Sequence, residues 1–521
     1  MGFSPSKLWS APEVNPINRK ARSVPLLNPI NVYGRVFFFS WFGFMIAFLS
    51  WYAFPPLLSD VIAKDIHMTK TQVSNSNIIA LVATLLVRLV AGPCCDRFGP
   101  RYTFAGCLLV GAIPTFLSGT AYNVQQLYAL RFFIGILGGS FVPCQVWTTG
   151  FYDKNIVGTA NSLTAGLGNA GGGITYFVMP AVYKSLVAEG LSSHKAWRVS
   201  FVVPGILITS IAIALVLCCP DTPTGAWADR TQAAENNLRQ HGVQGAVVDV
   251  PGTVTEDAKK SDSGSSSPSP PPQGGIADEE KKLDQTRGTF GDHEAVVGEQ
   301  TMLDTARGEV IQKPSLKEMS KVIFSPQTIV TGACYFCTFG AELSINSVLG
   351  QYYGAKFKFL GLQGAGNWAA MFGLMNVVFR PLGGVVSDFA YNSTGNVWAK
   401  KILMHTYSIL MGVVLVALGV SNPDQLYTVV LLIGILVAFF LEGANGLNYS
   451  LVPHVHPYAN GVVSGFTGAC GNLGGIVFAI VFRYNTPNYG KSLWIIGVMA
   501  IVINLAVCWI KPVPKGQIGG R

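Results

Sequence analysis

Twelve long apolar runs constrain this chain more than any other feature of its sequence. A helix needs about 20 apolar residues to cross roughly 30 Å of hydrocarbon, and each run has that length. Only 12% of the residues are charged, against roughly a quarter in soluble globular proteins. We therefore expect an all-α membrane protein of twelve transmembrane helices. The expected spans are residues 36–58, 74–95, 102–122, 126–147, 157–182 and 197–219, and then 328–352, 367–386, 402–420, 426–447, 461–482 and 492–510.

The gap between the sixth and seventh runs has a different composition. Residues 261–275 read SDSGSSSPSPPPQGG, and few aromatic residues follow. Such a segment cannot bury enough apolar surface to fold, so we expect a largely disordered cytoplasmic linker. The expected domains are a cytoplasmic N-terminal tail (1–35), a six-helix bundle (36–219), the linker (220–326), a second six-helix bundle (327–510) and a cytoplasmic C-terminal tail (511–521).

The formal net charge of +9 raises the question of an acidic partner. The basic residues are scattered between apolar blocks, which favours lipid headgroups over nucleic acid as their partner. The short loops that lie inside when both termini are cytoplasmic carry more Lys and Arg than the outer loops, so we expect that orientation. Most cysteines fall in apolar runs, where reduced cysteine behaves as a small hydrophobic residue. We expect no disulfide framework, no metal site and no cofactor.

The two halves of the chain repeat the same unusual polar residues at the same spacings. The fifth and eleventh spans contain TAGLGNAGG (164–172) and TGACGNLGG (467–475). A duplicated six-helix unit explains these repeats, and duplicated halves that meet around a central site are typical of secondary transporters. Residues spaced four apart repeat between the second and eighth spans, as Arg88, Gly92 and Asp96 and as Arg380, Gly384 and Asp388.

Arg88 and Arg380 each lie eight residues from an aspartate that we expect at the cytoplasmic membrane edge, and hence about 12 Å deep. A charge at that depth costs at least about 3 kcal/mol. Neither arginine has an acidic residue nearby on its own helix, so we interpret both as unpaired cations that bind an anion. The alternative is a carboxylate partner within each bundle, but Glu342 and Glu442 are not expected at the same depth. A guanidinium also matches a planar oxyanion in two-point contact.

Asn169 and Asn472 carry amides that are costly in lipid, and we expect an amide donor beside the anion. Gly168 and Gly471 allow helices to approach closely, which packing alone would also explain. The spacing G-x-G-x-x-G at residues 166–171 matches a dinucleotide fingerprint, but no strand precedes it, and we reject that interpretation.

Several motifs resemble those of known transporters. Residues 92–101, GPCCDRFGPR, resemble the G-x-x-x-D-R-x-G-R-R loop of the major facilitator superfamily, with Pro100 in place of an arginine. Arg131 and Gly135 resemble a second superfamily motif. Segments 165–173 and 468–476 resemble the two nitrate signatures of the nitrate/nitrite porter family, and 335–340, YFCTFG, is similar to its span-seven motif. The long central segment resembles that of fungal plasma-membrane nitrate transporters.

This resemblance implies a plasma-membrane transporter in which two pseudo-symmetric bundles rock around bound nitrate, and also nitrite. It implies no enzymatic chemistry, and we expect a monomer. The resemblance also implies proton coupling, with protons as partners, since fungal relatives are regarded as proton symporters. Exchange of nitrate for nitrite, as in some bacterial relatives, stays open as the alternative, and two uncompensated arginine charges would slow the return of an empty carrier and favour it. A porter for another small anion and a nitrate sensor that does not transport are the alternatives. The implied substrate site comprises Arg88, Arg380, Asn169, Tyr335, Phe339, Asn472, Gly168 and Gly471, and the implied gating motif Asp96, Arg97, Arg101, Arg131 and Asp388.

Overall fold

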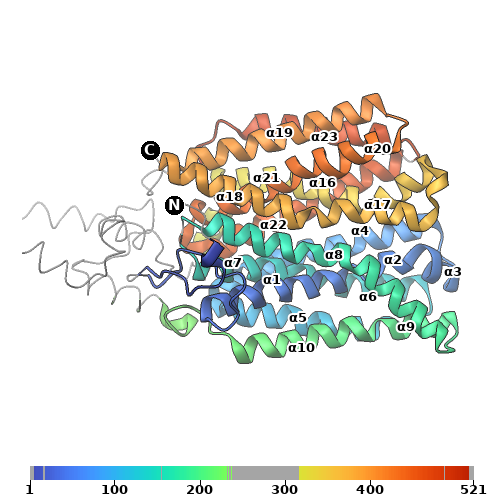
Figure 1. Cartoon of the computed structure of the whole chain (residues 1–521), viewed down its shortest axis with the longest axis horizontal. Coiled ribbons are helices and arrows are strands. Elements are labelled where there is room, and N and C mark those ends of the chain that lie inside the picture. The colour runs from blue at the N-terminus through green and yellow to red at the C-terminus, as the bar shows by residue number, and fades with distance from the viewer. Residues whose placement is uncertain are drawn as a thin grey trace, which may run out of the picture.

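The computed structural model describes residues 5–15, 18–153, 155–230, 233, 236, 316–485 and 487–514. In these ranges the chain forms helices and three isolated β-bridges, and no strand. The helices run side by side, with those of the first half below those of the second half in Figure 1 and both termini at one end. The expected disordered linker falls largely outside the described ranges and stays a prediction.

Several helices of the first half begin at a capping side chain. The Thr69 side chain accepts from the backbone N–H of Gln72, whose side chain accepts from Thr69 in return, and Asn123 caps the fourth span. The main helices are α1 (Val32–Trp51), α4 (Lys70–Phe98), α5 (Pro100–Phe116), α6 (Val124–Ile134), the 3-10 turn η4 (Gly135–Ser140), α7 (Phe141–Phe151), α8 (Val157–Ala188), α9 (Ser193–Ser200) and α10 (Val202–Cys218).

The second half repeats this arrangement. Its first long helix has Pro326 at its first position, behind the capping side chain of Ser325. The helices are α15 (Leu316–Ile323), α16 (Pro326–Lys356), α17 (Gly361–Leu374), α18 (Asn376–Thr394), α19 (Val397–Ser421), α20 (Leu426–Val430), the π-helix η7 (Leu431–Val437), α21 (Ala438–Val455), α22 (Asn460–Asn485) and α23 (Tyr489–Val507).

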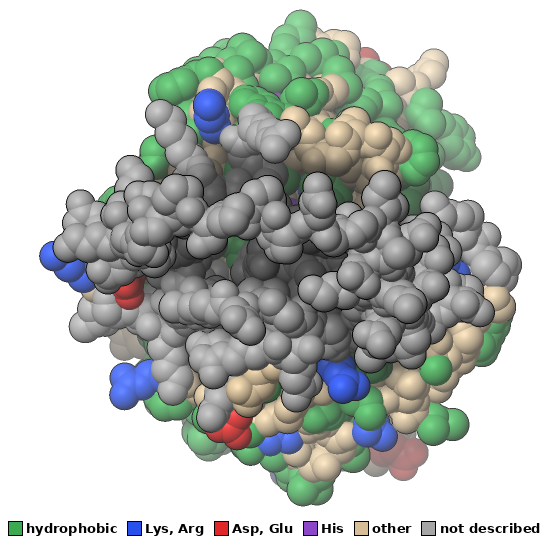
Figure 2. Space-filling model, turned by 90° about the vertical axis from the view of Figure 1, so that its left-hand side faces the viewer, with side chains coloured by type: hydrophobic (Ala, Val, Ile, Leu, Met, Phe, Trp, Pro, Cys, Tyr) green, Lys and Arg blue, Asp and Glu red, His purple; other side chains and the backbone are tan. Residues whose placement is uncertain are grey.

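Eleven helical segments of the described chain are long and apolar enough to cross a membrane. The remaining expected span, α8, is 32 residues long, but its glycines and Asn169 lower its mean hydropathy. It packs between α1 and α18 and completes the first six-helix bundle. Viewed from the end where the termini lie, hydrophobic side chains predominate on the upper flank (Figure 2). The expected all-α membrane fold is confirmed, and exposed apolar side chains cover its sides, among them Val110, Ile113, Leu217, Val420 and Val502.

The two halves meet along equivalent pairs of helices, α4 with α22 and α18 with α8. A Cβ atom on Gly92 would lie 2.4 Å from the carbonyl oxygen of Gly461, and one on Gly384 would lie 2.4 Å from that of Gly158. Only glycine allows the backbones to approach so closely. The repeated glycines of the second and eighth spans therefore lie at the interface between the halves.

Several spans are interrupted, and two of the interruptions lie next to buried residues of the interior. The expected span 126–147 consists of α6 and α7, joined by η4, and the expected span 367–386 consists of α17 and α18, which meet at Met375. Phe141 opens α7 and Asn376 opens α18. Such breaks leave backbone groups free to bind other partners.

Candidate functional site

Arg88 of α4 and Arg380 of α18 face the same two aromatic rings. Both arginines are 0% exposed. The guanidinium carbon of Arg88 lies 4.9 Å from the centre of the Phe141 ring and 5.1 Å from that of Phe339. The guanidinium carbon of Arg380 lies 5.8 Å from both ring centres. The two cations, one from each half, therefore share one buried site.

Arg88 is held by backbone carbonyl groups alone. Its Nε donates to the oxygen of Gly138 at 3.0 Å, in the interrupted turn η4, and its Nη1 donates to the oxygen of Gly468 at 3.1 Å. Its Nη2 is buried and has no hydrogen-bond partner among the described residues. No carboxylate of the described chain forms an ion pair with it, so its charge is only partly balanced by carbonyl dipoles.

Arg380 has a different environment, which corrects the expectation that both arginines are unpaired. Its Nη1 lies 3.5 Å from Oε2 of Glu342 and 3.9 Å from Oε2 of Glu442. Its Nη2 donates to the Tyr335 hydroxyl at 2.7 Å, and its Nη1 donates to Oδ1 of Asn376 at 3.3 Å. Both glutamates come from other helices, α16 and α21, and lie at the depth of Arg380. The Nε atom of Arg380 is buried without a partner in the described ranges.

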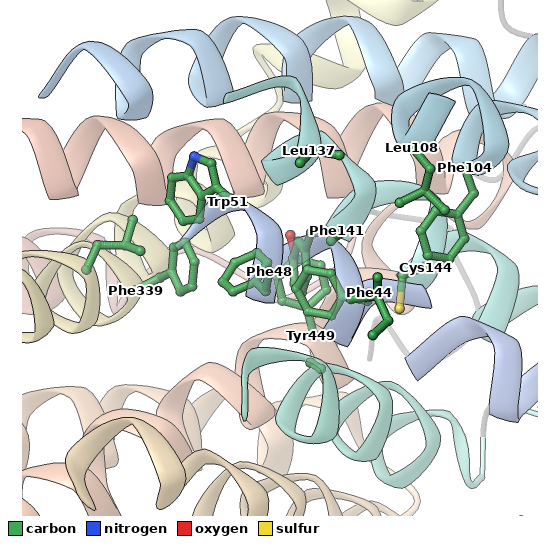
Figure 3. Close-up of a cluster of buried hydrophobic side chains, with 14 of the residues drawn as sticks. Phe44, Phe48, Trp51, Phe104, Leu108, Leu137, Phe141, Cys144, Phe339 and Tyr449 are labelled. Atoms are coloured by element: carbon green, nitrogen blue, oxygen red, sulfur yellow. The ribbon is translucent and has the colours of Figure 1, made fainter. Parts of the chain in front are cut away.

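Aromatic rings form the walls of this site. The rings of Tyr335 and Phe339 stack 4.8 Å apart at 5°, and the Phe339 ring lies 6.4 Å from that of Phe141 at 11°. Tyr449 packs edge-on against Phe141 at 4.7 Å. Figure 3 shows Phe141 and Tyr449 beside Phe44 of α1. The sequence-predicted pair Tyr335 and Phe339 thus lies at the site, together with two aromatic residues that the sequence analysis missed.

Asn169 and Asn472 hold equivalent positions but make different hydrogen bonds. The amide nitrogen of Asn169 donates to Oδ1 of Asn376 at 3.5 Å, across the two halves. That of Asn472 donates to the carbonyl oxygen of Gly468 at 3.0 Å within its own helix, and the same oxygen accepts from Arg88. Each asparagine therefore touches a direct partner of one arginine.

Gly168 and Gly471 bring helix backbones against the site's rings. A Cβ atom on Gly168 would lie 1.9 Å from the Phe44 ring, and one on Gly471 would lie 2.6 Å from that of Tyr335 and 2.9 Å from that of Phe339. Any side chain at these positions would displace an aromatic residue of the site. The glycines therefore act on the site through packing.

Asp96 and Asp388 cap helices of the opposite half, at the end where the termini lie. Asp96 accepts from the backbone N–H of Gly461 at 3.1 Å and of Val462 at 3.0 Å, in the first turn of α22. Asp388 accepts from the backbone N–H of Thr159 at 2.6 Å, in the first turn of α8. A carboxylate at a helix N-terminus is stabilised by the free N–H groups and the helix dipole. These two caps join the halves beneath the arginine site.

The other expected gating residues make contacts within their own part of the chain. Nε of Arg101 lies 2.5 Å from Oδ1 of Asp221. Nη2 of Arg131 donates to Oδ1 of Asn77 at 2.9 Å. Arg97 is exposed and lies over the ring of the residue that follows it. These contacts do not join the two bundles, in contrast to those of the aspartates.

Comparisons with known proteins agree with this fold. The sequence model of the Major Facilitator Superfamily matches residues 40–479. Elsinochrome transporter 1 of Elsinoe fawcettii is 44% identical over 98% of this chain and 99% of its own length. High affinity nitrate transporter 2.5 of Arabidopsis thaliana is 28% identical over 94% of this chain and 82% of its own. The proton:xylose symporter XylE has the same fold, with a TM-score of 0.60 at 16% identity over 93% of this chain and 97% of that structure.

The expected resemblance to the nitrate/nitrite porter family is supported, because named nitrate transporters match more than nine-tenths of this chain. The match of the family model extends through both bundles and includes Arg88, Asp96 and Arg380. Together with the paired six-helix bundles, it shows that this chain is a transporter-type membrane protein of the major facilitator superfamily.

Proposed function

We propose that this protein carries nitrate, and also nitrite, across the plasma membrane by alternating access of its two bundles. The observation that carries the proposal is the arginine pair. Arg88 Nη2 and Arg380 Nε are buried donors without partners in the described chain, and both guanidinium groups lie beside the rings of Phe141 and Phe339. A buried donor without an acceptor costs about 1–3 kcal/mol, more when it is charged, and a bound anion would remove that cost.

The shape of the site favours a small, flat anion. The rings of Phe141 and Phe339 are nearly parallel, at 11°. A planar oxyanion offers its edge to a guanidinium fork and its face to an aromatic ring. Both arginines are 0% exposed, so a larger substrate would have to displace the rings as well as bind the cations.

The helix caps supply the moving part of the proposed mechanism. Asp96 and Asp388 hold the halves together at one end of the site, each through backbone N–H groups of the opposite half. Rocking of the bundles must break both caps to open the site at that end. In the proposed cycle the caps form whenever the site is closed to the side where the termini lie.

A second candidate substrate comes from the fungal relative that is named an elsinochrome transporter and is 44% identical to this chain. The identity of that relative exceeds the 28% of the nitrate transporter from Arabidopsis thaliana. Similarity over the whole chain does not separate substrates, because these depend on a few residues of the site. The arginine pair favours nitrate.

Uptake of labelled nitrate tests the proposal in cells that lack their own nitrate porter. Expression of this chain should produce saturable nitrate uptake, and Arg88→Lys at an equal surface level should remove most of it. Uptake of elsinochrome without nitrate uptake would identify the second candidate. Nitrate binding without transport of either compound would favour a sensor.

A further inference from the structure

Two acidic side chains lie beside Arg380 in the interior of the membrane-spanning region. Glu342 of α16 is 3% exposed and Glu442 of α21 is 0% exposed. Ionisable residues in the middle of a membrane protein are costly and mark pathways of ions or protons. Structural neutralisation of Arg380 would require one carboxylate, whereas the structure places two within 4 Å of its Nη1.

One amide group joins the two carboxyl groups. The amide nitrogen of Asn445 donates to Oε2 of Glu342 at 2.9 Å and to Oε2 of Glu442 at 3.5 Å. Two ionised carboxylates that share one donor repel each other, and this repulsion favours a proton on one of them. Oε1 of Glu442 has no partner in the described part of the chain and is free to hold one.

The formal charges around this pair sum to zero when both carboxylates are ionised. Arg88 and Arg380 contribute two positive charges, and Glu342 and Glu442 contribute two negative charges. An anion bound between the arginines would leave one negative charge in a buried site, and burying an uncompensated charge costs several kcal/mol. One proton bound to the carboxyl pair removes this negative charge. Arg380, Asn376 and Asn445 contact the pair directly. Tyr335, Arg88 and Tyr52 are the other titratable groups close enough to interact electrostatically with Glu342.

The ion pair links the two binding events directly. An anion on Arg380 competes with Glu342 for the same guanidinium group, which already donates to Glu342 at 3.5 Å. A carboxylate that shares its cation with a second anion binds a proton more readily, because the charged form is less stabilised. Binding of the anion and binding of the proton therefore reinforce each other, as linkage requires.

We infer that Glu342 and Glu442 form a proton-binding site that takes up at least one proton each time the arginine pair takes up an anion. The inference rests on the proposed nitrate transport. The proton enters with the anion from one side and leaves with it on the other. The empty site with both carboxylates ionised and the loaded site with one anion and one proton therefore carry the same net charge. The empty carrier then returns without two uncompensated positive charges, which removes the reason to favour exchange.

Glutamine variants separate proton coupling from anion movement. Glu342→Gln and Glu442→Gln keep the shape of the side chain in its neutral form. In proteoliposomes, each variant should still exchange internal nitrate for labelled external nitrate, while accumulation driven by an acidic external pH falls at least about tenfold, within the usual range of coupling between sites. Glu189→Gln is the matched control, since Glu189 is exposed, and it should retain both activities.

Unchanged pH-driven accumulation in both glutamine variants would overturn the inference, and so would loss of exchange by variants that reach the membrane. Proton uptake by the purified wild-type protein gives a test that needs no variant. Addition of nitrate in weakly buffered solution should raise the pH, because the protein takes up about one proton from the solution for each nitrate bound, as linkage predicts. Nitrate binding without proton uptake would overturn the inference. Absence of nitrate binding and exchange in the wild type would instead overturn the proposed substrate.

Discussion

The two halves carry the same arginine at the same place in the repeat, but they stabilise it in different ways. Arg88 is held by the carbonyl oxygens of Gly138 and Gly468. Arg380 is held by the carboxylate of Glu342 and by the Tyr335 hydroxyl. The N-terminal half therefore contributes a cation without a counter-charge, and the C-terminal half contributes an ion pair.

This difference assigns different tasks to equivalent residues. A cation that is balanced only by carbonyl dipoles attracts an anion throughout the cycle, because no carboxylate has to leave it before the anion binds. A cation in an ion pair can exchange its carboxylate for the anion, and it can therefore report anion binding to a proton site. Duplication supplied the symmetric framework, and Glu342 and Glu442 make one half different from the other.

The largest expected effect comes from removal of each charge. Arg380→Gln leaves two carboxylates without their cation, and breaking a buried pair costs about 3–5 kcal/mol. Arg88→Gln removes a cation that has no carboxylate partner. We expect Arg380→Gln to lower the surface level strongly and Arg88→Gln to reach the membrane normally, although both abolish nitrate uptake. Surface labelling measures the difference.

A rescue variant sharpens this prediction. The double variant Arg380→Gln with Glu342→Gln should recover part of the surface level, because it removes one of the uncompensated carboxylates. Equal surface levels of Arg88→Gln and Arg380→Gln would show that the two environments do not differ in the folded protein.

The helix caps differ between the halves in a similar way. Asp388 accepts from Nζ of Lys400 at 2.8 Å, and both side chains are buried, whereas Asp96 binds backbone N–H groups of α22 and no Lys or Arg side chain in the described ranges pairs with its carboxylate. Asp388→Asn leaves Lys400 without its counter-charge, at a cost of about 3 kcal/mol. In Asp96→Asn, the side-chain carbonyl oxygen can still accept a hydrogen bond from the first turn of α22. We expect a lower Tm in detergent for Asp388→Asn than for Asp96→Asn, and equal values would contradict the comparison.

Lysine substitutions test the geometry of the clamp while they keep its charge. Arg88→Lys and Arg380→Lys should each weaken nitrate transport at least about tenfold, because lysine lacks the two-point fork. Initial rates of labelled nitrate uptake, corrected for surface level, measure the loss. Near-normal uptake by either variant would remove that arginine from the clamp, and a loss of surface level would indicate a structural role.

The sequence predicted the helical fold because apolar runs of membrane length carry that information directly. It also predicted that Arg88 and Arg380 are buried, since their spacing from Asp96 and Asp388 sets their depth. It did not predict the ion pair of Arg380, because partners on other helices cannot be found from spacing along one helix.

Two other features were missed for related reasons. Phe141 lies at the site because the turn η4 ends directly before it, and the only local signal is the pair Gly138-Gly139. Tyr449 reaches the site through packing of α21 against α16. Such contacts depend on how helices cross, which periodicity within a single span does not determine.

The smallest expected effect distinguishes the two signature asparagines. Asn169 donates across the halves to Asn376, which in turn accepts from Arg380, whereas Asn472 donates to a carbonyl of its own helix. Loss of a side chain that bridges the halves should alter anion binding more than loss of a bond within a helix, where a typical hydrogen bond contributes about 1 kcal/mol. We expect Asn169→Ala to raise the KM for nitrate several-fold, and Asn472→Ala to raise it less. Uptake measured over a range of nitrate concentrations gives both values. A larger effect of Asn472→Ala would mean that its amide turns toward the anion when the site is loaded, and that Arg88 rather than Arg380 holds the more sensitive end of the clamp.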